Sequence, residues 1–168
     1  MYRRITIWAI SALIALSVAT TALSDEQPSE LIQIISDEGI ELCQYTDTEG
    51  HPTIGYGHLI TASDDFPRCI TRATARTLLH SDYLRAERSV TRSYPWAEQQ
   101  TRLVLINMTY QLGTEGLSSF RRFLRAAEER DRNLAAVEML SSLWAKQTPE
   151  RAGRLAIRIL TNRRVCYK

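Results

Sequence analysis

Three side chains within a short stretch of the sequence have the chemistry needed to hydrolyse a glycosidic bond: Glu38, Asp47 and Thr53. Such hydrolysis needs a carboxylic acid that protonates the leaving oxygen, and a second carboxylate on the other side of the sugar that acts as base or nucleophile. A Glu with apolar neighbours would favour its neutral form, while an Asp open to water would stay ionised beside a Thr hydroxyl that helps to hold a water. The same residues also fit a helix-end charge and an Asx turn without any catalytic role.

The elements that must position these side chains are a helix and a small sheet. Residues 29–38 carry apolar side chains at helical spacing, and Gly39 is predicted to end that helix. Residues 42–60 favour strands, with a turn at 48–52, so we expect an antiparallel hairpin or a three-stranded sheet. Glu38 then ends the helix, Asp47 enters the turn and Thr53 opens the returning strand.

The rest of the chain is predicted to be helical. The apolar spacing and the Gly, Asn and Pro breaks indicate helices at about 71–92, 97–112, 117–130, 132–145 and 149–161. The sequence therefore predicts an α+β protein with one domain, 25–168. We expect a sheet lobe at about 39–70, joined by the long helix to a helical lobe at about 93–168.

The composition indicates a globular protein with an uneven distribution of charge. The chain is 44% hydrophobic and 24% charged, which argues against a disordered or fibrous protein. Residues 25–67 hold ten acids and no Lys or Arg, whereas residues 120–168 hold twelve bases and five acids. A basic half is typical of proteins that bind nucleic acid, an anionic membrane or an acidic polymer. Alternatively, two lobes of opposite charge simply attract each other.

The first residues have the pattern of a targeting segment. Residues 5–24 contain no charge and follow Arg3 and Arg4, so we expect residues 1–24 to take no part in the fold. Ala22-Leu23-Ser24 fits a cleavage site, but twenty uncharged residues also just span a bilayer and could insert transiently without cleavage. Either route predicts export across the inner membrane to the periplasm.

Three stretches of sequence resemble one known family. The spacing Glu38-x8-Asp47-x5-Thr53 lies in EGIELCQYTDTEGHPTIGYGHLI, and two further blocks follow in the same order, LINMTYQLGTEGLSSF (105–120) and LWAKQTPERAGR (143–154). Together they resemble glycoside hydrolase family 24, the family of the T-even phage lysozyme, over almost all of residues 29–168. The resemblance implies a two-lobed lysozyme-like fold and an endolysin that cuts the β-1,4 bond between N-acetylmuramic acid and N-acetylglucosamine in peptidoglycan.

The resemblance also implies roles for individual residues. Glu38 would be the general acid, and Asp47 with Thr53 would activate a water that inverts the anomeric carbon. Four further positions match residues of the family's cleft: Leu59, Tyr110, Gln111 and Arg151. Arg151 is implied to pair with Glu38, which would favour ionised Glu38 and oppose the apolar surroundings. His58 is implied to pair structurally with Asp82.

The resemblance implies a monomer without cofactor, metal or nucleic-acid partner. The three Cys do not stand at metal-ligand spacing, and the three His do not cluster with them. The alternative activity within the same superclass is that of a lytic transglycosylase, which needs only one Glu; Asp47 and Thr53 argue against it. A wall-binding protein without catalysis is the other alternative.

The sequence departs from the family pattern at several places. The stretch between His58 and Ile70 is shorter, and two family sugar contacts fall on Phe123 and Glu138, whose residue types do not match. The cysteines are not part of the pattern. We expect a Cys43–Cys69 disulfide that leaves Cys166 free; the competing hypothesis is that Cys43 is a redox switch that changes partner when the protein leaves the membrane.

Overall fold

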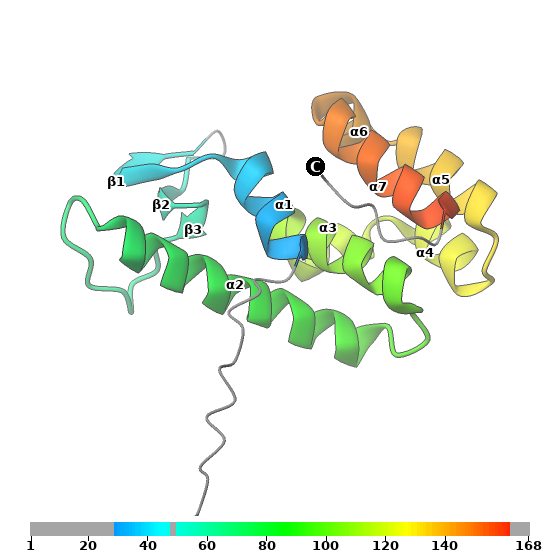
Figure 1. Cartoon of the computed structure of the whole chain (residues 1–168), viewed down its shortest axis with the longest axis horizontal. Helices are drawn as coiled ribbons and strands as arrows, with labels where there is room; N and C mark the ends of the chain where they lie inside the picture. Colours follow the sequence, from blue (N-terminus) through cyan, green and yellow to red (C-terminus); the bar gives the residue numbers. More distant parts are fainter. Residues whose placement is uncertain (1–28, 48–49, 162–168) are drawn as a thin grey trace, which may run out of the picture.

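The computed structural model describes residues 29–47 and 50–161, which form seven helices and a three-stranded sheet. A small sheet lobe and a larger helical lobe lie at opposite ends of the molecule, and one long helix runs along both (Figure 1). The elements in order are α1 (Ser29–Glu38), β1 (Glu41–Thr46), β2 (Pro52–Gly55), β3 (His58–Leu59), α2 (Arg72–Ser93), α3 (Gln99–Ser118), α4 (Arg121–Glu128), α5 (Arg132–Leu140), α6 (Leu143–Gln147) and α7 (Pro149–Thr161). The predicted α+β class is confirmed. The expected leader and Cys166 lie outside the described residues.

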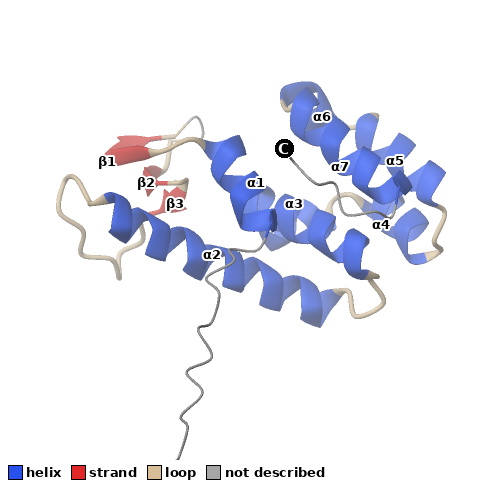
Figure 2. Cartoon of the chain, viewed as in Figure 1, coloured by secondary structure: helices blue, strands red, loops and turns tan. Residues whose placement is uncertain are grey.

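The sheet is an antiparallel meander in the order β1-β2-β3, as Figure 2 shows in red. Tyr45 lies opposite Thr53, and Thr53 lies opposite Leu59, so Thr53 occupies the central strand. The register shifts between Glu41 and Tyr45, which marks an irregularity in β1. Of the two predicted alternatives, an antiparallel hairpin or a three-stranded sheet, the structure has the three-stranded sheet.

Two local signals place the helices on either side of this sheet. Gly39 has a φ of +68°, a left-handed conformation that favours glycine, and α1 ends at the residue before it. Thr71 caps α2, because its hydroxyl accepts a hydrogen bond from the Thr74 N–H at 3.1 Å. These signals fix where the sheet lobe begins and ends.

The helical lobe differs from the prediction at two places. The predicted helix 132–145 is wrong: it divides into α5 and α6, because the Ser142 hydroxyl accepts from the Ala145 N–H and begins a new helix. The predicted helix 117–130 is also too long, since residues up to Ser118 continue α3 beyond a kink at Gly113, and α4 begins only at Arg121.

One hydrophobic core runs through both lobes. Its fully buried members come from the sheet, the long helix and the helical lobe, among them Leu31, Ile54, Leu79, Leu105, Met108, Phe123 and Met139. Gly55 fits the sheet against α2, since a Cβ at this position would lie 3.4 Å from the Cβ of Ala75. Among the described residues, no helix is both long and apolar enough to cross a bilayer.

Candidate active site

Glu38 lies where the two lobes meet, and a residue from the far end of the chain holds it. The Arg151 guanidinium donates a 2.7 Å hydrogen bond to Glu38 Oε1. Arg151 is buried in α7, with 7% of its side chain exposed, while the Glu38 side chain keeps 21% exposure. The carboxylate is thus anchored on its inner side and still reaches solvent.

A second carboxylate fixes the arginine. Asp37 precedes Glu38, is 5% exposed, and lies 3.3 Å from Arg151 Nε. Arg154, one turn further along α7, also pairs with Asp37, and Gln33 donates to it at 3.0 Å. Buried charges are stable only when they are paired and hydrogen-bonded, so these side chains form one unit that ties α1 to α7.

Sequence reasoning identified Arg151 but missed Asp37 and Arg154. A signal was available, because Asp37 and Glu38 are adjacent acids at a helix end, while Arg151 and Arg154 are three residues apart on a predicted helix and therefore share a face.

The turn between β2 and β3 approaches Glu38 from the sheet lobe. Gly57 has a φ of +83°, and a Cβ built on it would lie 3.8 Å from Glu38 Oε2. The left-handed backbone is what favours glycine at this position, since a Cβ at 3.8 Å would make only an ordinary contact with the carboxylate.

Asp47 and Thr53 are joined through the peptide groups of one residue, His51. Asp47 Oδ1 accepts a hydrogen bond from the His51 N–H at 2.8 Å, and the Thr53 hydroxyl donates to the His51 carbonyl at 3.1 Å. The His51 ring also lies near the carboxylate, with Nδ1 3.7 Å from Asp47 Oδ2. Thr53 is buried and Asp47 is half-buried, so the pair is built within one hairpin.

Tyr45 and Glu38 line one cavity, and the charge of Asp47 also acts on the Tyr45 phenol. Burial raises the pKa of the Tyr45 phenol above 10.0, and the negative charges of Glu38, Asp47 and Glu41 raise it further. The ring is 38% exposed and lines a cavity of about 460 Å³ together with Glu38 and Glu41. Sequence reasoning missed Tyr45, whose aromatic type was interpreted only as a strand signal.

The four predicted cleft positions have different surroundings. Leu59 is 48% exposed and lies on β3, opposite Thr53. The Tyr110 hydroxyl donates to the Tyr56 carbonyl at 2.7 Å and so links α3 to the sheet lobe. Gln111 is exposed and accepts from the Trp144 indole at 2.9 Å, whereas Arg151 is the buried partner of Glu38.

His58 contacts the long helix and not the catalytic candidates. Its Nδ1 lies 2.8 Å from Asp82 Oδ2, its Nε2 lies 3.9 Å from Asp64, and Phe66 packs edge-on against the ring. The imidazole is buried between these groups. This geometry suits the structural pairing that the resemblance implies.

A disulfide closes the sheet lobe beside the cleft. Cys43 and Cys69 are bonded to each other, and their backbones form a bridge between β1 and the segment before α2. Cys43 also lines the cavity that holds Glu38 and Tyr45. Within the residues that the structure describes, no cluster of three or more His, Cys, Asp or Glu could hold a metal ion.

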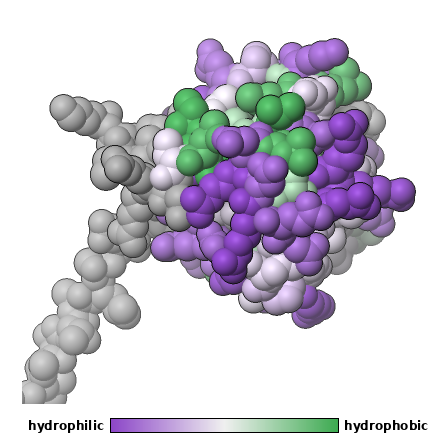
Figure 3. Space-filling view, turned by 90° about the vertical axis from the view of Figure 1, so that its right-hand side faces the viewer, coloured by the Kyte–Doolittle hydropathy of each residue, from purple (hydrophilic) through white to green (hydrophobic). Residues whose placement is uncertain are grey.

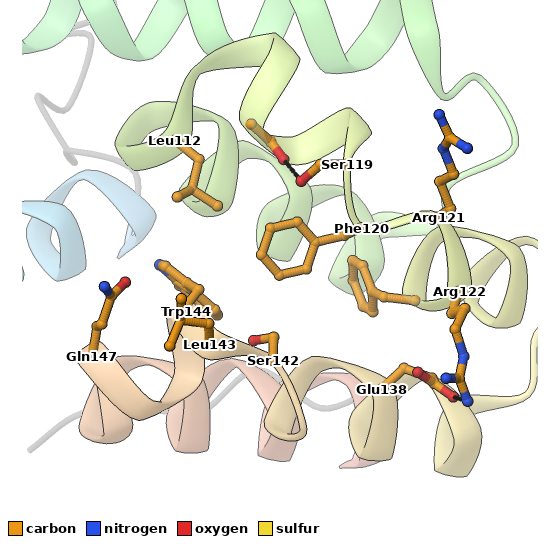
Figure 4. Close-up of a pocket in the computed structure, with 12 residues that line it drawn as sticks. Leu112, Ser119, Phe120, Arg121, Arg122, Glu138, Ser142, Leu143, Trp144 and Gln147 are labelled. Atoms are coloured by element: carbon orange, nitrogen blue, oxygen red, sulfur yellow. Dashed lines mark hydrogen bonds and ion pairs between the residues drawn. The ribbon is translucent and has the colours of Figure 1, made fainter.

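A larger pocket of about 620 Å³ lies on the helical lobe. Figure 4 shows Phe120, Leu143 and Trp144 on its walls, with Arg122 and Glu138 paired at one end. The Arg122 guanidinium lies 2.6 Å from the Glu138 carboxylate. Phe123 and Glu138, the two positions that depart from the family pattern, both line this pocket, which is therefore apolar with a charged rim.

The comparisons with known proteins identify the family. The model of the phage lysozyme family matches residues 36–166, which include Glu38, Asp47, Thr53 and Arg151. The chain belongs to the phage lysozyme family. The predicted family is confirmed, and membership supports a lysozyme (muramidase) activity, that of a glycosidase.

The relatives found in the comparisons include cellular and phage proteins. Probable T4-type lysozyme 2 of Dictyostelium discoideum is 31% identical over 146 residues, covering 71% of this chain and 86% of the relative. Probable T4-type lysozyme 1 of the same organism is 31% identical over 160 residues, covering 79% and 94%. The pre-baseplate central spike protein Gp5 of Enterobacteria phage T4 is 32% identical over 158 residues, covering 78% of this chain and 27% of Gp5.

Proposed function

We propose that this phage-lysozyme-family protein is an inverting muramidase that hydrolyses the β-1,4 bond between N-acetylmuramic acid and N-acetylglucosamine in peptidoglycan. The observation that carries the proposal is the Glu38 carboxylate, which is paired with Arg151 and lines a cavity of the sheet lobe, together with the hairpin in which Asp47 is linked through His51 to the Thr53 hydroxyl. An acid and a water-holding pair are the groups that inverting hydrolysis requires.

Each proposed step moves one proton. Protonated Glu38 gives its proton to the glycosidic oxygen as the bond to the anomeric carbon breaks. Asp47 accepts a proton from the water that Thr53 helps to orient, and the water oxygen bonds to the anomeric carbon from the opposite face. Arg151 then stabilises the Glu38 carboxylate that forms, because a charge-assisted hydrogen bond favours the ionised form.

The proposed substrate contacts come from both lobes. Leu59 offers an exposed apolar surface on the sheet lobe, and Tyr110 and Gln111 approach from α3. Tyr45 adds a phenol that stays neutral at physiological pH, because burial and the surrounding carboxylates raise its pKa. A neutral hydroxyl between two acids is suited to donate a hydrogen bond to a sugar oxygen or to a carboxylate.

We further propose that the enzyme acts as a monomeric endolysin outside the inner membrane, without a nucleic-acid partner. The uncharged residues 5–24 after Arg3 and Arg4 support export, and the Cys43–Cys69 disulfide is typical of an oxidising compartment. N-terminal sequencing of the protein from membrane and periplasmic fractions tests this part. Recovery of the protein from the cytosol alone, whether or not residues 1–24 have been removed, would refute it.

Mass spectrometry of the sugars released from purified peptidoglycan tests the proposed reaction. Hydrolysis leaves reducing N-acetylmuramic acid ends that gain the mass of one water. Anhydro ends would instead show a lytic transglycosylase. Release of no sugar at all, by a protein that sediments with the wall, would show a binding protein without catalysis.

A further inference from the structure

The large apolar side chains that remain exposed are concentrated on one part of the helical lobe. Among the described residues, eight are exposed, and two of these, Tyr45 and Leu59, belong to the candidate active site. The other six all lie on three consecutive helices: Leu134, Val137 and Leu140 on α5, Leu143 on α6, and Ile157 and Leu160 on α7. We call these six residues the α5–α7 apolar face.

These helices pack against one another within the helical lobe, on the right-hand side of Figure 1. Viewed from that side, apolar side chains gather in the upper part of the surface, above a broad hydrophilic area (Figure 3). The exposure is considerable, since Leu143 is 70% and Val137 57% exposed. Grouped exposed apolar residues indicate a surface that contacts a partner or a membrane.

The helical lobe that carries this face has an excess of basic residues. Residues 120–161 hold nine Lys and Arg against five acids, whereas residues 29–70 hold eight acids and one Arg. Arg121, Arg125 and Lys146 are exposed and form no ion pair with any described residue. Arg121 and Leu143 line the same pocket on opposite sides of it (Figure 4).

We propose that the α5–α7 apolar face binds the surface of an anionic lipid bilayer. Apolar side chains that enter the boundary between headgroups and acyl chains, with cations at the headgroups, are the features by which surface-bound helices hold a membrane. A protein partner of opposite charge would match the cations equally well, but an adjacent bilayer is the partner that the first residues of this chain supply.

The first part of the chain keeps the folded body close to a bilayer. Residues 5–24 are uncharged and long enough to lie in a membrane, and only residues 25–28 separate them from α1. A four-residue link spans at most about 14 Å when fully extended. The body is then always within reach of lipid headgroups, and the unequal charge of the lobes decides which end turns toward them.

The sheet lobe is oriented away from the membrane by the same charges. Its excess of acids is repelled by anionic headgroups, so the cavity lined by Glu38 would face away from the bilayer. The face would hold the enzyme at the membrane with its site open toward the wall. This inference rests on the apolar face, on charge and on the proposed place of residues 5–24 in the membrane, and its readout does not depend on catalysis.

Spin labels on the full chain test the proposal. In a Cys166→Ser background, which leaves the Cys43–Cys69 disulfide intact, a label is attached at Val137→Cys or Leu143→Cys, and a control label at Thr77→Cys, an exposed residue on α2. The protein is reconstituted into vesicles of phosphatidylglycerol and phosphatidylethanolamine, or of phosphatidylcholine alone. Accessibility to oxygen and to a water-soluble nickel complex is then compared.

In the anionic vesicles, we expect the labels on the face to gain oxygen access and to lose access to the nickel complex, while the control label stays in water. Phosphatidylcholine vesicles and high salt should weaken this protection, because salt screens the cations. Labels at Val137 and Leu143 that remain as accessible to nickel as the control label would overturn the proposal.

A pair of charge variants separates this face from bulk attraction. Arg121→Glu with Arg125→Glu should lower the protection of the Leu143 label about tenfold, since each cation near an anionic surface adds measurably to binding. Arg76→Glu with Arg88→Glu changes the net charge equally on exposed α2 positions and should have little effect. Equal losses from both pairs would overturn the proposal. Labels at Val137 and Leu143 that are protected from the nickel complex without vesicles would also overturn the proposal. Protection that rises with protein concentration would show that a second copy of the chain covers the face. Protection that does not depend on concentration would show that residues 5–24 cover it.

Discussion

The two halves of the candidate site are held in opposite ways. On the acid side, Glu38 and Asp37 are paired with Arg151 and Arg154, which lie more than a hundred residues away in the other lobe. On the side that is proposed to hold the attacking water, which we call the water side, Asp47 and Thr53 form hydrogen bonds with His51. His51 lies four residues from Asp47 and two from Thr53. One half depends on the complete tertiary fold, and the other depends on a single hairpin.

This difference separates stability from chemistry. Buried ion pairs between remote elements couple the position of Glu38 to global stability, because an unpaired buried charge is costly. The hairpin contacts are short-range and partly exposed, so they can be altered without unfolding the protein. Variants on the two sides should therefore affect activity and melting differently.

The largest effect is expected from Glu38→Gln. Loss of the proton donor should lower the hydrolysis rate by about a thousandfold, since general acid catalysis contributes on the order of 10²–10⁴. Thermal melting should show a folded protein, because Arg151 keeps its contact with Asp37. Clearing of permeabilised Gram-negative cells measures the rate, with Glu115→Gln, an exposed Glu on α3, as the matched control. Wild-type clearing by Glu38→Gln would refute the assignment.

The next effect is on stability, from Arg151→Ala. Removal of this cation leaves two carboxylates short of a partner, and breaking a buried pair costs about 3–5 kcal/mol. Urea unfolding measures the loss. Lys146→Ala, on the exposed surface of α6, should cost almost nothing. A small loss in Arg151→Ala would show that the network holds geometry and not stability.

Asp47→Asn should lower activity and leave stability nearly unchanged, the opposite of Arg151→Ala. The rate should fall about a hundredfold, since a general base supplies a factor of this size. The free energy of unfolding should change by less than about 1 kcal/mol, because the amide oxygen can still accept from the His51 N–H. Activity and urea unfolding are measured on the same sample. A variant that loses stability more than activity would break the contrast between the two halves.

The smallest effect is expected from Tyr110→Phe, at the contact between the lobes. Loss of the hydrogen bond to the Tyr56 carbonyl should cost about 1 kcal/mol. Burial raises the pKa of Tyr110 above 10.0, and the charges of Asp82 and Glu38 add to the rise. The folded chain then holds this proton more tightly than the unfolded chain, so stability is complete below pH 10 and falls as the pH rises further.

The free energy of unfolding of the wild type and of Tyr110→Phe, measured between pH 8 and pH 11, reveals this dependence, because a phenol ordinarily titrates near pH 10. The variant should lose less stability than the wild type above pH 10. Parallel curves for the two proteins would contradict the expected coupling of Tyr110 to folding.

Local signals predicted well which elements carry Glu38, Asp47 and Thr53, and predicted poorly which residues hold Glu38 in place. The end of α1 at Glu38 and the hairpin that carries Asp47 and Thr53 follow from a glycine, a turn and strand-favouring residues close together in sequence. The spacing of Arg151 and Arg154 indicates a shared helix face, but which acids that face meets depends on where α7 packs, and local spacing does not give that. Arg151 was identified only through resemblance to a family.

The boundary between α5 and α6 was not predicted because apolar residues continue at helical spacing on both sides of Ser141 and Ser142. The local signal was the residue type of Ser142, since serine favours the N-cap position that it occupies in α6. The exposed face of these helices was missed for a related reason. An apolar residue at helical spacing predicts a buried position, and Val137 and Leu143 have this spacing although no described element covers them.

The most direct test is the anomeric configuration of the first product. Proton NMR during cleavage of a soluble peptidoglycan fragment resolves the α and β anomers before they equilibrate. Attack of an Asp47-held water opposite Glu38 predicts that the α anomer of the new reducing end appears first, because the cleaved bond is β. Initial release of the β anomer, or of an anhydro sugar, would contradict the account.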